Sequence, residues 1–74
     1  MQHLDLSGLK CPLPVLRTRK ALRAMDTGVL EVRCTDPLAS IDIPHLVREM
    51  ECTLLDQRSD GATLIFTIQK GRYT

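Results

Sequence analysis

The spacing of apolar residues switches along this chain between a period of two and a helical period, and this alternation restricts the possible folds most strongly. The runs with strand-like spacing are residues 3–6, 29–35, 53–58 and 62–70, and those with helical spacing are residues 12–25 and 36–50. The last two strand-like runs are joined by Ser59-Asp60-Gly61, a connection of hairpin length. The pattern therefore predicts the order strand, helix, strand, helix, strand, strand.

This order predicts an α+β two-layer sandwich. The first two connections contain helices, which permits parallel pairing, and the last connection is an antiparallel hairpin. Because crossovers between parallel strands are right-handed, both helices should cover the same face of a four-stranded mixed sheet. With 74 residues the chain has room for one core, so we expect a single domain over residues 1–74.

Apolar residues on each predicted element define the expected core. On the first helix, the apolar side carries Pro14, Val15, Thr18, Ala21, Leu22 and Met25. The strands should turn Cys34, Leu64, Phe66 and Ile68 inward and leave Asp5, Glu31, Arg33, Thr63 and Thr67 facing water. Asp36 is predicted to be the N-cap of the second helix, before Pro37 at its first position, and Asp42 is also interpreted as a helix cap. Pro44 predicts a kink there or two short helical pieces.

Composition argues against several classes of function. The net charge is +1, so no strong field indicates a nucleic acid or a membrane as partner, and no apolar run approaches membrane-spanning length. The first residues lack the pattern of a signal peptide, and the cysteine and histidine spacings predict neither a disulfide framework nor a metal site. Scattered glycines indicate no phosphate loop, so no cofactor is expected. We expect a cytoplasmic protein with free thiols.

Cys11 is the most informative residue, because it stands directly before Pro12-Leu13-Pro14 at the expected start of the first helix. If Pro12 is the first helical residue, Cys11 is the N-cap, and the Leu13 N–H is the donor aimed at its sulfur. The helix dipole, with Lys10 beside it, should then lower the pKa of the thiol. The alternative is a buried, inert cysteine. Serine or aspartate caps a helix better than cysteine, so we favour a reactive thiol.

A reactive thiol without a second cysteine nearby suits the transfer of a group to and from one sulfur. A Cys–His dyad is a weaker interpretation, since His45 could reach Cys11 only through the fold. Cys34 is expected to pack in the core, and Cys52 is interpreted as structural or incidental.

Several motifs resemble the TusA/SirA family of small sulfur carrier proteins. They are Leu6-x-Gly8-Leu9-Lys10-Cys11-Pro12-Leu13-Pro14, Arg19-Lys20, Asp36-Pro37 and Asp42-Ile43-Pro44. The resemblance implies a persulfide on Cys11, framed by Pro12 and Pro14. It implies a donor protein, a cysteine desulfurase or another sulfurtransferase, and an acceptor protein, so that the chain acts with partner enzymes. Leu13 stands where members associated with tRNA thiolation often carry an acidic residue, so no pathway among tRNA thiolation, molybdenum cofactor synthesis and sulfur metabolism is singled out.

The outer side of the first helix offers a candidate docking surface. Leu13 and Leu16 project among basic side chains, and we expect Leu16, Arg17, Lys20 and Arg23 to contact an acidic partner surface. The alternative function is an RNA-binding or regulatory module that uses this basic face, with Cys11 only as a cap. No aromatic side chain interleaves the basic residues, so base stacking has no platform there.

Overall fold

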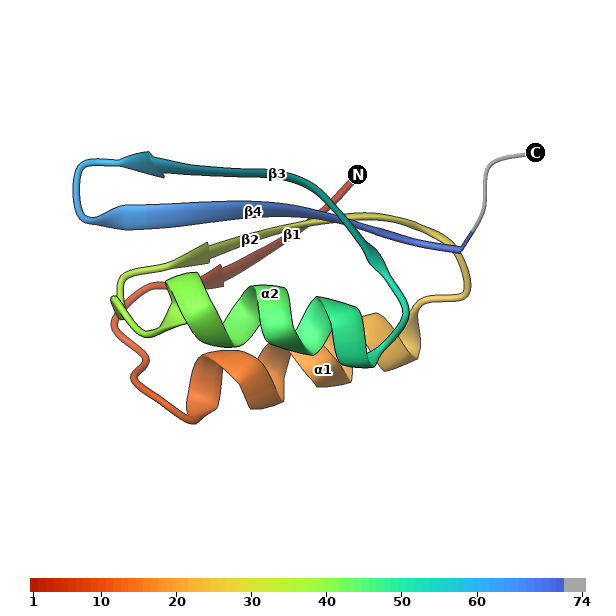
Figure 1. The fold of residues 1–74 in the computed structure, drawn as a ribbon, viewed down its shortest axis with the longest axis horizontal. Helices are drawn as coiled ribbons and strands as arrows, with labels where there is room; N and C mark the ends of the chain where they lie inside the picture. Colours follow the sequence, from red (N-terminus) through yellow and green to blue (C-terminus); the bar gives the residue numbers. More distant parts are fainter. Residues whose placement is uncertain (72–74) are drawn as a thin grey trace.

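The computed structural model describes residues 1–71, which form a four-stranded sheet with two helices packed on one face (Figure 1). In chain order the elements are β1 Gln2–Leu6, α1 Leu13–Ala24, β2 Gly28–Cys34, α2 Ala39–Glu49, β3 Thr53–Asp60 and β4 Thr63–Lys70. The predicted βαβαββ order and the two-layer α+β class are confirmed, and both helices lie on the same side of the sheet.

The strands lie side by side in the order β1-β2-β4-β3. β1 and β2 are parallel, with Leu4 opposite Val32, whereas β4 is antiparallel to both β2 and β3. The crossover through α2 therefore passes over β4, and the last strand in the sequence occupies the interior of the sheet. Because β1 and β2 are parallel, the loops that follow them leave the same edge of the sheet, and α1 and α2 begin at that edge (Figure 1).

The core consists of aliphatic side chains around Phe66, which is fully buried. The other buried side chains of the sheet include Leu30, Val32, Cys34 and Ile68, and the helices contribute Leu22, Ile43, Leu46 and Val47. The predicted inward-facing positions of β2 and β4 are thus confirmed, since Leu64 also packs against this cluster. The predicted apolar side of α1 is confirmed as well, with Pro14, Thr18 and Leu22 buried.

The start of α2 differs from the sequence prediction. Asp36 is not its N-cap, because a turn precedes the helix, which begins at Ala39. In this turn the Leu38 N–H donates to Asp36 Oδ1 (3.1 Å), and the Ala39 N–H donates to the Asp36 carbonyl (3.0 Å). An aspartate followed by proline favours such a turn, since its carboxylate accepts from the backbone two residues later. The carboxylate therefore organises the loop before α2.

Pro44 does not divide α2, which runs without interruption from Ala39 to Glu49, so the prediction of two pieces is wrong. Proline lacks the N–H that would bond to the Ser40 carbonyl four residues earlier. Gln57 of β3 supplies a substitute donor, because its Nε2 lies 3.5 Å from that carbonyl oxygen. A contact from the neighbouring strand thus partly replaces the lost helical hydrogen bond.

The hairpin between β3 and β4 is tighter than predicted. β3 continues to Asp60, and the connection narrows to Gly61-Ala62. Gly61 adopts a φ of +62°, a conformation that glycine reaches without a steric penalty, so the strands can pair up to Asp60 and Thr63.

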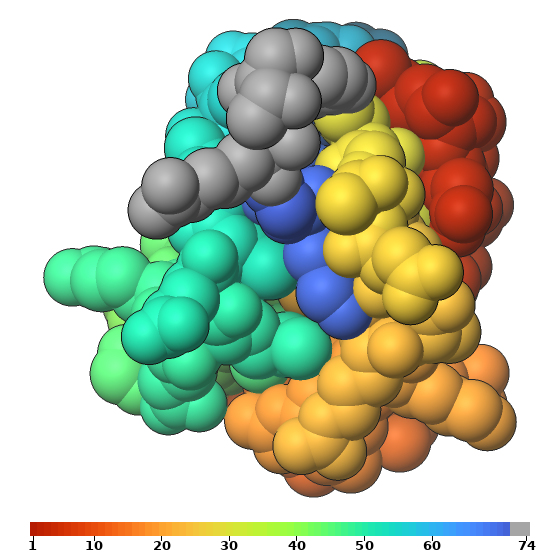
Figure 2. Space-filling view, turned by 90° about the vertical axis from the view of Figure 1, so that its right-hand side faces the viewer, coloured from red at the N-terminus to blue at the C-terminus, as the bar shows by residue number. Residues whose placement is uncertain are grey.

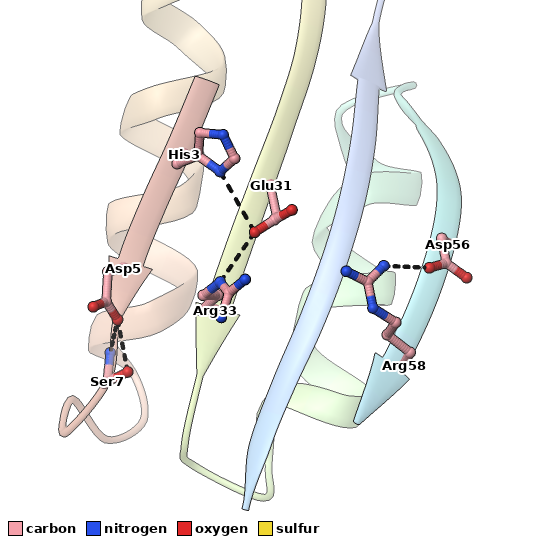
Figure 3. A network of polar contacts seen from close by, with 7 residues as sticks. All are labelled: His3, Asp5, Ser7, Glu31, Arg33, Asp56 and Arg58. Carbon is pink, nitrogen blue, oxygen red and sulfur yellow. Dashed lines mark hydrogen bonds and ion pairs between the residues drawn. The ribbon is translucent and has the colours of Figure 1, made fainter. Parts of the chain in front are cut away.

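The face of the sheet opposite the helices carries Asp5, Glu31 and Arg33 as predicted (Figure 3), but Glu31 is buried instead of facing water. Glu31 accepts a hydrogen bond from Arg33 Nε at 3.0 Å and lies 3.4 Å from His3 Nδ1. The hydrogen bond from Arg33 lowers the pKa of the Glu31 carboxyl group. Ile65 is an exception on this face, since it is buried between its cross-strand neighbours Arg33 and Arg58.

Candidate functional site

Two neighbouring loops, residues 7–12 after β1 and residues 35–38 after β2, meet at the edge of the sheet where both helices begin (Figure 1). The Gly8 N–H donates to Thr35 Oγ1 (2.8 Å), and the Cys11 N–H donates to Asp36 Oδ2 (2.6 Å). The second carboxylate oxygen of Asp36, Oδ1, accepts from the Leu38 N–H. The Asp36 carboxylate therefore connects the two loops. The carboxyl ends of parallel strands are where sheets of this kind commonly place their sites.

Cys11 is exposed in the turn before α1 and is not the N-cap of that helix. The N-cap is Pro12, the Cys11–Pro12 peptide bond is cis, and within residues 1–71 no side chain accepts a capping hydrogen bond from the first backbone N–H groups of α1. The Leu13 N–H, which was predicted to face the sulfur, donates instead to the Lys10 carbonyl at 2.9 Å. The predicted interaction of the sulfur with this backbone donor is therefore wrong, because the turn uses the donor itself.

The electrostatic surroundings of Cys11 also differ from the prediction. Its Sγ lies 3.6 Å from Asp42 Oδ2, in the geometry of a thiol donating to a carboxylate. Desolvation raises the pKa of the Cys11 thiol, and the hydrogen bond to Asp42 and the negative charges of Asp42 and Asp36 raise it further. The predicted lowering of this pKa is wrong, since two carboxylates lie near the sulfur and the helix end offers it no donor. These surroundings therefore favour the protonated thiol over the thiolate.

A pocket of about 200 Å³ opens beside Cys11 along the seam between the two helices. It is lined by Cys11, Pro12, Val15, Arg19, Asp42, His45, Leu46 and Glu49. Ion pairs close its far end, because Glu49 lies 3.6 Å from Arg19 Nη2 and 2.9 Å from His45 Nε2. Cys11 thus lines one end of a small pocket that also has apolar lining residues, and the Glu49 ion pairs lie at the other end.

The predicted site residues take different positions around this pocket. Pro12 lines it, Pro14 is buried on the inner side of α1, and Lys10 and Leu13 are exposed. The predicted docking residues Leu16, Arg17, Lys20 and Arg23 are all exposed on α1. Arg17 and Lys20 border a second groove of about 610 Å³ against β1, which Leu4, Ala21 and Ala24 also line. They do not line the pocket that contains Cys11.

Sequence reasoning missed the contribution of α2 to the site. Asp42 was interpreted as a cap, but it lies in the first turn of α2 with its carboxylate facing the sulfur. The sequence contains a signal for this, because Asp42, His45 and Glu49 follow one another at intervals of three and four residues. Residues at these intervals lie on the same side of a helix. On α1, Val15 and Arg19 are four residues apart. They line the same pocket from the opposite helix.

The other two cysteines are placed unlike Cys11. Cys34 is fully buried, and burial raises the pKa of its thiol to about 11. Cys52 is partly buried, and its Sγ lies 3.7 Å from the Met50 carbonyl. The expected core position of Cys34 is confirmed, and Cys11 is the only exposed cysteine of the three.

Within residues 1–71, no helix combines the length and the apolarity that crossing a membrane requires. In the same part of the chain, no three side chains among histidine, cysteine, aspartate and glutamate are grouped to hold a metal ion.

Fold and site together define a class: small two-layer α+β proteins that present one exposed cysteine between a strand and a helix. Comparison with known proteins is more specific, because the family model "Sulfurtransferase TusA" matches residues 2–70. The chain belongs to the TusA family of sulfur carrier proteins.

Individual relatives agree with this assignment. The chain is 41% identical over 70 residues to the sulfur carrier protein TusA of Allochromatium vinosum, covering 93% of this chain and 92% of that one. It is 42% identical over 69 residues to YrkI of Bacillus subtilis, covering 92% of each. The crystal structure of a SirA-like protein from Desulfitobacterium hafniense superposes with a TM-score of 0.86 at 25% identity, over 97% of this chain and all of that one. These relatives favour a sulfur carrier over an RNA-binding module.

Proposed function

We propose that Cys11 carries sulfur as a persulfide between a donor protein and an acceptor protein. The observation that carries this proposal is that Cys11 is exposed and lines the pocket between α1 and α2. Membership of the TusA family supports it, because sulfur carriers work with partner proteins.

The loading step balances without any further reagent. The Cys11 sulfur attacks the terminal sulfur of a donor persulfide, so the donor S–S bond breaks and a new S–S bond to Cys11 forms. The Cys11 proton ends on the donor thiol, and Cys11–SH plus R–S–SH gives Cys11–S–SH plus R–SH. Unloading is the same exchange with the acceptor thiol as attacking group.

The chain supplies position rather than a second catalytic group. Asp36 holds the Cys11 N–H and so fixes the turn that presents the sulfur. Neither of the other two cysteines is exposed. A persulfide on Cys11 therefore has no exposed thiol within the protein that could convert it to a disulfide. We place the exchange in the cytoplasm, where reducing conditions keep Cys11 as a thiol.

Docking of the partners is proposed for the outer side of α1. Leu13 and Leu16 are exposed there, next to the exposed cations of Arg17, Lys20 and Arg23. Apolar anchors with a charged rim are typical of protein interfaces, and the positive charge favours an acidic partner surface.

The test is loading of the purified protein with a cysteine desulfurase and cysteine, followed by intact-mass measurement. We expect a gain of one sulfur atom that a reductant removes. Cys11→Ser should not gain it, whereas the matched variant Cys52→Ser should gain it fully. Loading of Cys11→Ser, or loading that Cys52→Ser abolishes, would show that another sulfur is the carrier.

A further inference from the structure

Asp42 is the charged residue whose side chain accepts a hydrogen bond from the Cys11 thiol. Its Oδ2 lies 3.6 Å from Cys11 Sγ, and Asp42 is half-buried in the first turn of α2. Among the ion pairs formed within residues 1–71, none includes Asp42 or Asp36. The carboxylate beside the sulfur therefore lacks a cation within this part of the protein.

The charges around the sulfur come from four parts of the fold. They are Lys10 on its own loop, Arg19 on α1, Asp36 before α2, and Asp42, His45 and Glu49 on α2. Both pocket-lining side chains that can carry positive charge are bound to Glu49 at the far end. Lys10 is exposed and does not line the pocket. The immediate surroundings of the sulfur are thus dominated by two uncompensated carboxylates.

We propose that Asp42 is a positioning residue that holds Cys11 as a neutral thiol in the free protein and pairs with a cationic side chain of the docked sulfur donor. The second half of this proposal rests on the proposed carrier function. The raised pKa of Cys11 is consistent with the first half, which stands on the contact between Sγ and the carboxylate.

The pairing has a direct chemical consequence for loading. While Asp42 is unpaired, its charge disfavours the thiolate, so the thiol is a weak nucleophile. A lysine, arginine or protonated histidine of the donor that pairs with Asp42 cancels this charge and favours the thiolate. The Cys11 proton then passes to the leaving thiolate of the donor as the S–S bond moves, and no oxidant or reductant takes part. Reactivity is thereby coupled to docking of a partner with the correct charge.

The first measurement is the pH dependence of Cys11 alkylation by iodoacetamide, in a Cys52→Ser parent in which Cys34 stays buried. We expect Asp42→Asn to move the midpoint of the rate profile to lower pH and to raise the rate at neutral pH about threefold or more, because a negative charge next to the sulfur is removed. The matched control is Asp26→Asn, an equally conservative change of an exposed aspartate beyond the other end of α1, which should leave the midpoint in place.

The second measurement compares a cationic and an anionic methanethiosulfonate, carrying trimethylammonium and sulfonate groups. Their rate ratio reports the charge at the sulfur and cancels the fraction of thiolate. We expect the parent to favour the cationic reagent, and Asp42→Asn to lower this preference about three- to tenfold at low salt. Rising ionic strength should weaken the preference of the parent for the cationic reagent. This measurement does not depend on the folding of any Asp42 variant.

A midpoint in Asp42→Asn equal to that in Asp26→Asn would overturn the role in holding the thiol. A parent that reacts equally with both reagents, or favours the anionic one, would overturn the cationic partner. Neither measurement involves sulfur transfer. Failure here would therefore leave the desulfurase experiment intact, and failure of persulfide loading would leave the role of Asp42 in holding the thiol intact.

Discussion

A substitution of Leu16 can test docking without disturbing the fold. It is 48% exposed on α1 and makes no contribution to the buried core. Leu55 on β3 is 50% exposed and provides a matched position on another element. A charge at either position should cost little stability, since neither side chain is buried.

We predict that Leu16→Glu slows loading of Cys11 from a donor enzyme about tenfold, because an anchor of the docking surface is lost. Leu55→Glu should load at the rate of the unchanged protein. Circular dichroism should show both variants folded, and the time course of the mass gain provides the rates. If the two variants load equally fast, partners do not dock at Leu16.

At the scale of single residues, sequence reasoning predicted the exposure of Cys11 but not its chemical surroundings. The Cys-Pro-x-Pro order marks the junction of a loop and a helix, which is local information. Asp42 lies 31 residues further along the chain, and only the tertiary fold brings the first turn of α2 next to the sulfur. The direction of the pKa shift was missed for this reason, because it depends on contacts that local spacing does not encode.

Elements were predicted well where apolar periodicity is strong and less well at their ends. The core sides of both helices and of β2 follow directly from spacing. The ends depend on hydrogen bonds of individual turns, such as Asp36 to Leu38 before α2. The end of α1 is a further case, because Lys70 at the end of β4 donates from its Nζ to the carbonyls of Leu22 and Met25.

Lys70 therefore caps α1 from another element (Figure 2, where the blue end of β4 lies between the yellow connection after α1 and the teal end of α2). We predict that Lys70→Met, which keeps most of the aliphatic stem, lowers the free energy of unfolding by about 2 kcal/mol in urea titrations, because two carbonyls lose a charged donor. Lys20→Met on the exposed side of α1 is the control and should change it by less than about 0.5 kcal/mol. Equal stability of the two variants would contradict the capping role.

For the whole molecule, the buried Cys34 thiol links stability to alkaline pH. Its pKa is raised from 9.0 to about 11 in the folded state, mainly by burial. Above pH 9 the unfolded chain loses this proton while the native state keeps it, so unfolding becomes more favourable as pH rises. The contribution of Cys34 to the free energy of unfolding is fully present below pH 9 and is lost progressively as the pH rises towards 11.

We predict that Cys34 alone lowers the free energy of unfolding by about 1.4 kcal/mol per pH unit within this window. Urea titrations at several pH values should show a steeper alkaline decrease for the unchanged protein than for Cys34→Ala. The difference in slope isolates this thiol from the lysines and the other cysteines. Parallel slopes would mean that Cys34 ionises as easily in the native state as in the unfolded chain.

The strand order is the feature of the whole molecule that sequence reasoning did not provide, since periodicity does not say which strand of the hairpin pairs with β2. The structure places β4 between β2 and β3, although it is the last strand in the sequence. On the ribosome, the growing chain therefore cannot complete its sheet until residue 70 has emerged. A chain interrupted earlier would leave β2 without its partner β4 and the end of α1 without the Lys70 ammonium group.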